Sequence, residues 1–349
     1  MPSGQTRALS FVTDPIYGDH LRNAGHPESP GRVETVGARL HASGTLGKPL
    51  AARDASDEEL ERVHARAYLD LLEREVDAGR EPRYLSTGDA LIDAQSLAVA
   101  RRAAGGVVVA AEAAAGGNRA VFALVRPPGH HAEPARGMGF CLLNNVAIAA
   151  RAHLHRFGGR LLIVDFDYHH GNGTEAIAGR GVSYVSTHAD PAYPGTGQRS
   201  YRLDSDVVAN VPLPASGIST EAFMAVWEDL LPRVAEAVRP DLVLVSAGFD
   251  YAAGDCVGDL GVESKAAEGL AAVIEVVARR HCRGRVAYAL EGGYDLDVLT
   301  ESIEAIASVT GRGRVVFSGA DPAAIPSRVR STLREISYIA QGGEPGVAN

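Results

Sequence analysis

Short apolar runs alternate along the chain with longer stretches in which apolar residues recur every three or four positions. Two of the runs, LLIV at 161–164 and LVLV at 242–245, contain no polar residue, which is typical of strands buried on both faces of a sheet. The predicted strands are Ala8–Thr13, Ala120–Val125, Arg160–Asp165, Val182–Thr187, Asp241–Ser246 and Arg285–Leu290.

The stretches with helical period lie between these strands. The predicted helices include Asp57–Asp77, Asp93–Gly116, Asn144–Phe157, Thr220–Val238 and Glu263–Arg280. This alternation predicts an α/β fold in which helices cover both faces of a mainly parallel sheet of about eight strands. We expect residues 1–341 to form one domain and residues 342–349 (GGEPGVAN) to form a disordered tail.

Polar or glycine-rich sequence follows five of the predicted strands. The five segments are RPPGHHAEPARGMGFC, DYHHGNGTE, HADPAYPGTG, AGFDYAAGD and EGGYD. In a parallel sheet, ligands bind outside the carboxyl ends of the strands. The sequence therefore predicts that these five segments meet at one edge of the sheet and form a site there.

A metal site is indicated first by DFDYHHGNG, residues 165–173. If the chain stays extended past the strand, Asp165, Asp167 and His169 lie on one face, because side chains alternate with period two. A carboxylate and an imidazole on one face can bind the same metal ion. Taken alone, the Asp-x-His pattern more often marks a structural turn at the end of a strand.

The segment GFDYAAGD supplies a candidate for a third ligand, Asp255. Asp255 would complete a site of two aspartates and one histidine with open positions for water and substrate, as a catalytic zinc site requires. The same ligands also accept Fe(II) or Mn(II). Asp250, five residues earlier, is expected to serve backbone hydrogen bonds at the turn.

Two further motifs suggest hydrolysis. Two aspartate ligands nearly neutralise a zinc ion, so its water is less acidified than in an all-histidine site and a neighbouring base helps. His130 and His131 are candidates for that base. Tyr294 follows two glycines, and its hydroxyl could donate to a substrate carbonyl oxygen. Each motif alone also fits an ordinary surface turn.

Taken together and in this order, RPPGHHA, DFDYHHGNGT, YPGTG, GFDYAAGD and EGGYD resemble one family of the arginase–deacetylase fold. They are similar to histone deacetylases and acetylpolyamine amidohydrolases, and most of all to the bacterial and class II members. The resemblance runs from about His26 (HPESPGR) to about Val309. It implies a zinc ion bound by Asp167, His169 and Asp255.

The resemblance also implies catalytic roles. His131 becomes the general base and acid, His130 an electrostatic partner oriented by Asp165, and Tyr294 the group that polarises the carbonyl. Asn172 stands where many class I relatives carry an aspartate, which predicts a less basic His131. Tyr294 departs from the class IIa pattern, in which a histidine at this position accompanies poor deacetylase activity.

Further sites follow from the resemblance alone. A K⁺ ion is expected beneath the zinc, held by side chains or backbone of Asp165, Asp167, His169, Ser186 and Thr187. Substrate-binding residues are expected at Asp89, Gly139, Phe140, Tyr193, Val262 and Gly292. Val262 is chosen as the residue seven positions after the third ligand, where the family places a side chain of the tunnel rim. Arg32 resembles an arginine that lines an exit channel for acetate.

Composition and charge mainly argue against certain partners and compartments. The 43 acidic and 34 basic residues give a net charge of −9 without a basic cluster, which argues against a nucleic-acid partner. The three cysteines have no CxxC spacing, which indicates a reducing compartment. No signal pattern and no apolar run of about 18 residues is evident, so we expect a cytoplasmic protein without a membrane partner.

The predicted function is zinc-dependent removal of an acetyl or short acyl group from an acylated primary amine. Acyl-lysine, a small acylated amine and acetylpolyamines all fit as substrates. Two other readings are a non-catalytic acyl-lysine or polyamine binder and an arginase-like enzyme with two manganese ions. The short stretch Asp77–Thr87 shows no long insertion like the entrance-narrowing loop through which amidohydrolase relatives often dimerise, which favours a more open mouth. A homodimer stays an open alternative.

Overall fold

The structure is a computed structural model that describes residues 9–79, 81–117 and 120–343. Within these ranges the main sheet has nine strands in the order β2-β1-β5-β11-β10-β6-β7-β9-β8. All neighbouring strands are parallel except β8, which pairs antiparallel with β9. The strands are β1 (Ser10–Thr13), β2 (Leu50–Ala51), β5 (Ala120–Ala123), β6 (Leu161–Asp165), β7 (Val182–Asp190), β8 (Tyr201–Leu203), β9 (Asp206–Pro214), β10 (Leu242–Ala247) and β11 (Val286–Leu290).

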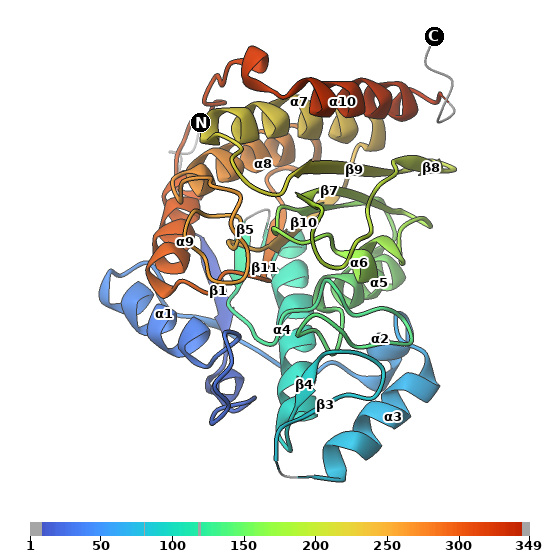
Figure 1. Ribbon diagram of the computed structural model, residues 1–349, viewed down its shortest axis with the longest axis vertical. Coiled ribbons are helices and arrows are strands. Elements are labelled where there is room, and N and C mark those ends of the chain that lie inside the picture. Colours follow the sequence, from blue (N-terminus) through green and yellow to red (C-terminus); the bar gives the residue numbers. More distant parts are fainter. Residues whose placement is uncertain (1–8, 80, 118–119, 344–349) are drawn as a thin grey trace.

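Helices cover the sheet in two layers (Figure 1). The first layer contains α1 (Gly31–Ala42), α7 (Thr220–Val238), α8 (Ala266–Cys282) and α9 (Leu296–Thr310), with α10 (Ser327–Ala340) packed on α7. The second contains α4 (Ser96–Gly117) and α5 (Asn145–Phe157), flanked by α2 (Asp57–Glu61) and α3 (Arg66–Asp77). The short elements are α6 (Asn172–Glu175), a β3–β4 pair (Arg83–Tyr84, Leu91–Ile92) and two 3₁₀ turns (Pro15–Gly18, Pro322–Ala324).

The predicted fold class is confirmed, and all six predicted strands are present with ends that differ by a few residues. Ala8 and residues 344–349 of the expected tail lie outside the described residues. The sequence pattern missed β9, because Asn210 and two prolines interrupt its apolar run. Asn210 is nevertheless buried, and its amide donates to Glu175 Oε2 at 2.9 Å and to the Arg199 carbonyl at 2.8 Å.

The predicted helix Asp57–Asp77 is split into α2 and α3. His64 lies in the break and is almost fully buried. Its Nδ1 lies 3.1 Å from the Glu133 carbonyl oxygen, and its Nε2 accepts from the Asn144 N–H at 3.0 Å. These two contacts hold the chain out of the helical path and tie it to the loop that carries the histidine pair.

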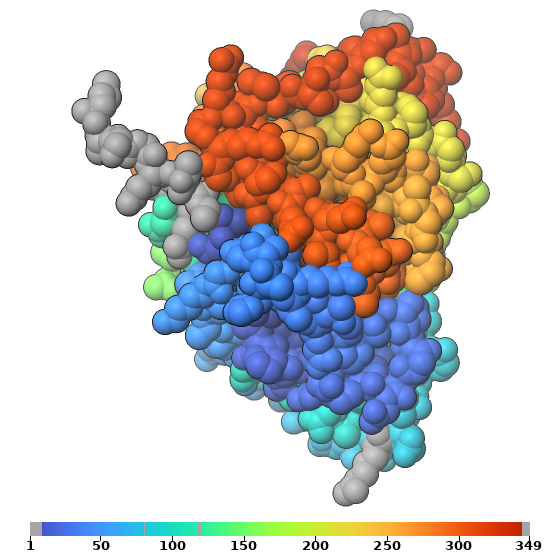
Figure 2. Space-filling model, turned by 90° about the vertical axis from the view of Figure 1, so that its left-hand side faces the viewer, coloured from blue at the N-terminus to red at the C-terminus, as the bar shows by residue number. Residues whose placement is uncertain are grey.

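The first helix lies beside the ninth although they are far apart in sequence, and Figure 2 shows α1 in blue against α9 in orange. Arg39 of α1 forms an ion pair of 2.6 Å with Asp297 and donates to the Leu296 carbonyl at 3.0 Å. This contact brings the start of α1, where Arg32 lies, to the loop after β11. No helix in the described part of the chain is long and apolar enough to cross a membrane.

Candidate active site

A cavity of about 260 Å³ lies where the loops after β5, β6, β7, β10 and β11 meet, as the strand pattern predicted. The predicted residues that line it are Asp89, His130, His131, Gly139, Phe140, Asp167, His169, Tyr193, Gly292 and Tyr294. The structure therefore brings most of the predicted site residues into one place. It differs from the prediction at the third metal ligand and at the rim.

Three side chains form a group that could hold a metal ion. Asp167, His169 and Asp250 each offer a ligand atom within 4.8 Å of the others. His169 Nδ1 lies 3.2 Å from Asp167 Oδ1 and 3.0 Å from Asp250 Oδ2. The backbone N–H of Tyr168 donates to Asp250 Oδ1 at 3.0 Å, which joins the ends of β6 and β10.

The chemistry of this group fits a divalent cation. Asp250 Oδ2 is fully buried and has no hydrogen bond of good geometry; its ion-pair partner is His169 Nδ1 at 3.0 Å, and buried carboxylates are costly unless their charge is balanced. Burial and the nearby Asp167 carboxylate raise the pKa of Asp250 to about 6. A cation would relieve both burial and repulsion, and two carboxylates with one imidazole are ligands that zinc accepts.

The structure groups Asp250, and not the predicted Asp255, with Asp167 and His169. Asp255 is also buried, but both of its oxygen atoms are already in use. Oδ2 accepts from the N–H groups of Tyr294 (2.6 Å) and Asp295 (3.1 Å). Oδ1 accepts from the N–H groups of Val257 (2.9 Å) and Gly258 (3.3 Å). The sequence feature that could have identified Asp250 is its position three residues after the end of β10.

His130 lies among carboxylates. Its Nδ1 is 3.2 Å from Asp165 Oδ2, which is the predicted pairing, and its Nε2 is 3.8 Å from Asp167 Oδ1. The Tyr184 hydroxyl donates to Asp165 Oδ2 at 3.0 Å and fixes that carboxylate. Burial lowers the pKa of His130, but Asp167 and Asp165 outweigh burial and raise it to about 10. The two carboxylates therefore favour the protonated form of His130.

His131 has the opposite character. Its Nδ1 lies 2.8 Å from Asn172 Oδ1, a neutral partner. Burial first, and then the neighbouring His130 and His169, hold the pKa of His131 well below its usual value. Because an amide oxygen can only accept, the Nδ1 atom of His131 carries the proton and Nε2 has a free lone pair. His131 is therefore the neutral, basic member of the pair.

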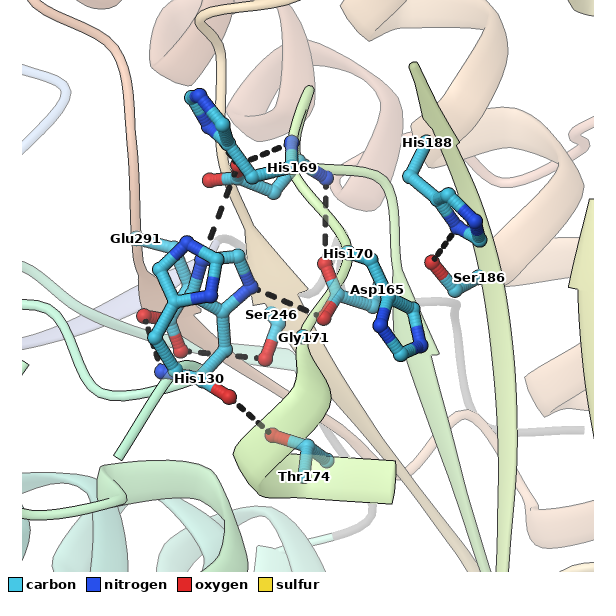
Figure 3. Close-up of polar contacts among 12 residues, drawn as sticks. His130, Asp165, His169, His170, Gly171, Thr174, Ser186, His188, Ser246 and Glu291 are labelled. Atoms are coloured by element: carbon cyan, nitrogen blue, oxygen red, sulfur yellow. Dashed lines mark hydrogen bonds and ion pairs between the residues drawn. The ribbon is translucent and has the colours of Figure 1, made fainter. Parts of the chain in front are cut away.

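Glu291 supports the histidine loop from beneath, and the sequence analysis gave it no role. Its Oε2 accepts from the N–H groups of Gly129 (2.6 Å) and His130 (3.1 Å), and its Oε1 accepts from the Ser246 hydroxyl (3.1 Å). Figure 3 shows His130 linked to both Glu291 and Asp165. Burial raises the pKa of Glu291 to about 7. Its position directly after the apolar strand β11 is the sequence feature that could have identified Glu291 as a site residue.

The Tyr294 loop is fixed at several points. Gly292 N–H donates to Asp167 Oδ2 at 2.8 Å, and the Gly292 carbonyl accepts from the Phe249 N–H at 3.0 Å. Gly293 has a φ of +109°, which a side chain would strain. The Tyr294 ring packs edge-on against Phe140, with 6.0 Å between centroids. These contacts fix the main chain of the loop, and Tyr294 lines the same cavity as Asp167 and His169.

Arg32 lies behind this loop and does not line the cavity. It is fully buried, its Nε donates to the Gly293 carbonyl at 2.7 Å, and its guanidinium lies 4.8 Å from the Tyr294 ring centroid. Glu28 pairs with Arg32 at 3.2 Å and with Arg126 at 2.7 Å. Burial alone would raise the pKa of Glu28, but the two guanidinium groups, Arg126 first, lower it to about 2.

Aromatic rings form the cavity walls. The Tyr193 ring meets the His131 ring edge-on, with 5.2 Å between centroids, and Phe140 lies opposite near Tyr294. Gly139 has a φ of +56°, and a Cβ there would come within 2.3 Å of the His131 ring. Asp89 lies at the exposed mouth, where its Oδ1 accepts from the Gly139 N–H (2.8 Å) and the Tyr193 hydroxyl (3.1 Å).

Val262, which was predicted to lie at the rim of the cavity, does not line it. Val262 is fully buried, forms a β-bridge with Ala252 and accepts from the Ala253 N–H at 2.8 Å. Val257 lines the cavity in its place. Val257 stands seven residues after Asp250, so the error in the rim follows from the error in the third ligand.

The predicted K⁺ residues lie on neighbouring strands. Asp165 of β6 is directly opposite Ser186 of β7. His188 Nε2 lies 3.0 Å from the Gly197 carbonyl, so that nitrogen donates and Nδ1 accepts the Ser186 hydroxyl at 3.0 Å (Figure 3). The Ser186 oxygen thus keeps its lone pairs for another partner. Thr187 Oγ1 is buried and has no hydrogen-bond partner.

Comparisons with known proteins agree with this geometry. The histone deacetylase domain family matches residues 26–310. Histone deacetylase 14, chloroplastic, of Arabidopsis thaliana is 34% identical over 303 residues, which cover 80% of this chain and 71% of that protein. The histone deacetylase-like amidohydrolase of Pseudomonas aeruginosa is 36% identical over 282 residues, 78% of this chain and 73% of that protein.

A solved structure also matches nearly the whole chain. The HDA15 HD domain superposes with a TM-score of 0.81 at 29% identity, covering 95% of this chain and 96% of that one. Some longer curated relatives are matched over only about half of their length. The domain match and these relatives place the chain in the histone deacetylase family and make it a deacetylase-type hydrolase.

Proposed function

We propose that this protein is a zinc-dependent amidohydrolase that removes an acetyl or short acyl group from an acylated primary amine. One observation carries the proposal: Asp167 and His169, which group with the buried Asp250, line the same cavity as the two histidines and Tyr294. A zinc ion held by this group would supply Lewis-acid activation of water and of the amide carbonyl.

The protein residues divide the remaining work. His131, neutral and with a free Nε2, accepts a proton from the attacking water and returns it to the leaving amine. His130, protonated beside Asp165, stays cationic and stabilises negative charge as it develops. The Tyr294 hydroxyl donates to the carbonyl oxygen on the side away from the metal group. Two features support this division: His130 faces the Asp165 carboxylate whereas His131 faces the neutral Asn172 amide, and the pKa of His130 is raised whereas that of His131 is lowered.

The cavity suits a narrow acylated side chain. Phe140 and Tyr193 offer flat apolar walls to a methylene chain, and small Gly139 lets the chain pass close to His131. The Gly139 carbonyl, which accepts from Cys141 Sγ at 3.2 Å, would also accept the amide N–H, and Asp89 at the mouth would offer its Oδ2 to a donor of the substrate. Arg32 stabilises the Tyr294 loop from behind and is the candidate for guiding acetate away.

The K⁺ site is a second part of the proposal. Asp165, Ser186 and backbone near Asp167, His169 and Thr187 would hold the ion. The pairing of Asp165 with Ser186 across β6 and β7 supports it, as does the free lone-pair side of the Ser186 oxygen. A monovalent cation there would offset the charge of the Asp165 carboxylate, which is fully buried.

The alternative enzyme class, with two manganese ions, receives less support. Among the described residues, Asp167, His169 and Asp250 form the one group of metal-binding type. The non-catalytic binder is disfavoured because the base, the tyrosine and the metal group are all present in one cavity. An acetylpolyamine-selective enzyme stays the main alternative for the substrate.

Metal retention tests the ligand set. Asp250→Ala should lose most of the zinc that survives gel filtration, because it removes one of three protein ligands, whereas the wild type should retain about one zinc per chain. Zinc content is measured by inductively coupled plasma mass spectrometry. Asp255→Asn is the matched control and should keep its zinc. Full zinc in Asp250→Ala together with loss in Asp255→Asn would restore the original assignment.

Turnover of an acetyl-lysine peptide tests the catalytic roles. Tyr294→Phe should keep its zinc and lower kcat by roughly 10²–10³-fold, the usual cost of one lost oxyanion donor. His131→Ala should cost at least as much, because two proton transfers depend on it. His130→Ala should cost less. If His130→Ala were the more damaging of the two across the pH profile, the roles of the histidines would be reversed.

A substrate panel tests the rim. Val257 places no charge at the mouth, and Glu263 pairs with Lys265 at a different surface groove. We expect kcat/KM for acetyl-lysine peptides to be at least comparable to that for acetylspermidine. Val257→Glu should move the ratio toward acetylspermidine by about tenfold or more, through attraction of its internal ammonium group. A wild-type preference for acetylspermidine of 100-fold, about 2.7 kcal/mol, would contradict the expectation.

A further inference from the structure

Asp255 is a buried carboxylate outside the metal group, and its four hydrogen bonds all go to backbone N–H groups. One oxygen holds Val257 and Gly258 of its own loop, after β10. The other holds Tyr294 and Asp295 of the loop after β11. A single side chain therefore joins the loop with the rim valine to the loop with the proposed carbonyl-polarising tyrosine.

The bond to Tyr294 is short and charge-assisted. Asp255 Oδ2 lies 2.6 Å from the Tyr294 nitrogen, and hydrogen bonds to a carboxylate are about twice as strong as neutral ones. On the other side of Gly293, Gly292 is held by Asp167 Oδ2. The main chain of this turn is thus fixed at one end by a metal-group residue and at the other end by Asp255.

We propose, on the basis of the proposed function, that Asp255 is a positioning residue that sets the place of the Tyr294 hydroxyl over the metal group. Asp255 touches neither the metal group nor the cavity, so it acts through Tyr294 and Val257. A displacement of about 1 Å in a catalytic group can cost about 10²-fold in rate, so a main-chain anchor next to the tyrosine has a measurable effect.

The variant Asp255→Asn tests this role with little change in size. The amide turns one acceptor atom into an NH₂ group, which then faces two N–H donors instead of accepting from them. One of the two loops must shift. We expect zinc content to stay at the wild-type level, kcat to fall roughly 10- to 100-fold, and KM to change much less.

Asp259→Asn is the matched control in the same loop. The Asp259 carboxylate also accepts from two backbone groups, Gly254 N–H (3.0 Å) and Gly261 N–H (2.7 Å), but it does not reach the Tyr294 loop. Its activity should stay within about twofold of the wild type. An equal loss in both aspartate variants would show a general loosening of the loop and overturn the proposal.

A double-mutant cycle shows whether Asp255 acts through the tyrosine. In the Tyr294→Phe background the hydroxyl is already absent, so adding Asp255→Asn should cost less than about threefold in kcat. A full 10- to 100-fold loss in that background would mean that Asp255 acts by another route. If Asp255→Asn is poorly folded, Asp255→Ser, which can still accept on one side, serves in the same cycle.

Ligand binding separates this proposal from the proposed function. A short alkyl hydroxamic acid chelates zinc, and its carbonyl oxygen can accept the Tyr294 hydroxyl. Titration calorimetry on the zinc-loaded protein should show about tenfold weaker binding for Asp255→Asn than for the wild type, and no such difference in the Tyr294→Phe background. If the wild type hydrolysed no acylated amine but the affinities still differed in this way, the proposed function would be wrong and the positioning role would stand. Equal affinities in wild type and Asp255→Asn would sink the positioning role.

Discussion

The burial of several carboxylates at the ends of β6 and β10 is the constraint on which the site depends. Asp165, Asp167 and Asp250 are almost fully removed from solvent, and buried charges are costly unless they are paired. His130 lies beside Asp165, and a single imidazole nitrogen, His169 Nδ1, lies within 3.2 Å of both Asp167 and Asp250. One imidazole between two buried carboxylates leaves negative charge to be balanced at this point. A cation at this point explains why so polar a group is stable inside the protein.

The same charge arrangement separates the two histidines. Carboxylates surround His130 and keep it protonated, whereas His131 meets the neutral amide of Asn172 and the positive charge of its neighbour. Adjacent residues of one type thereby acquire opposite roles. Behind them, Glu28 with Arg32 and Arg126 forms a second buried ionic group that fixes α1 against the Tyr294 loop.

Strand positions could be predicted because apolar runs are local signals, and most cavity residues could be predicted because the motifs after the strands resemble those of a known family. The third member of the metal group could not be predicted, because Asp250 and Asp255 lie in the same loop. Only the folded chain shows that both oxygen atoms of Asp255 already accept hydrogen bonds from backbone N–H groups. The rim prediction at Val262 was wrong for the same reason, because it was placed seven residues after Asp255 instead of seven residues after Asp250. Strand β9 and the break at His64 escaped prediction because distant buried hydrogen bonds, with Glu175 and Asn144, override the local pattern.

The central claim is that Asp167, His169 and Asp250 hold one metal ion beside the histidine pair. Diffraction from zinc-loaded crystals, measured at the zinc absorption edge, tests it most directly. The account predicts one anomalous peak per chain, about 2.0–2.2 Å from His169 Nδ1 and from one oxygen of each aspartate, with Asp255 still bound to the Tyr294 loop. A peak coordinated by Asp255, or a second peak bridged by carboxylates, would contradict it.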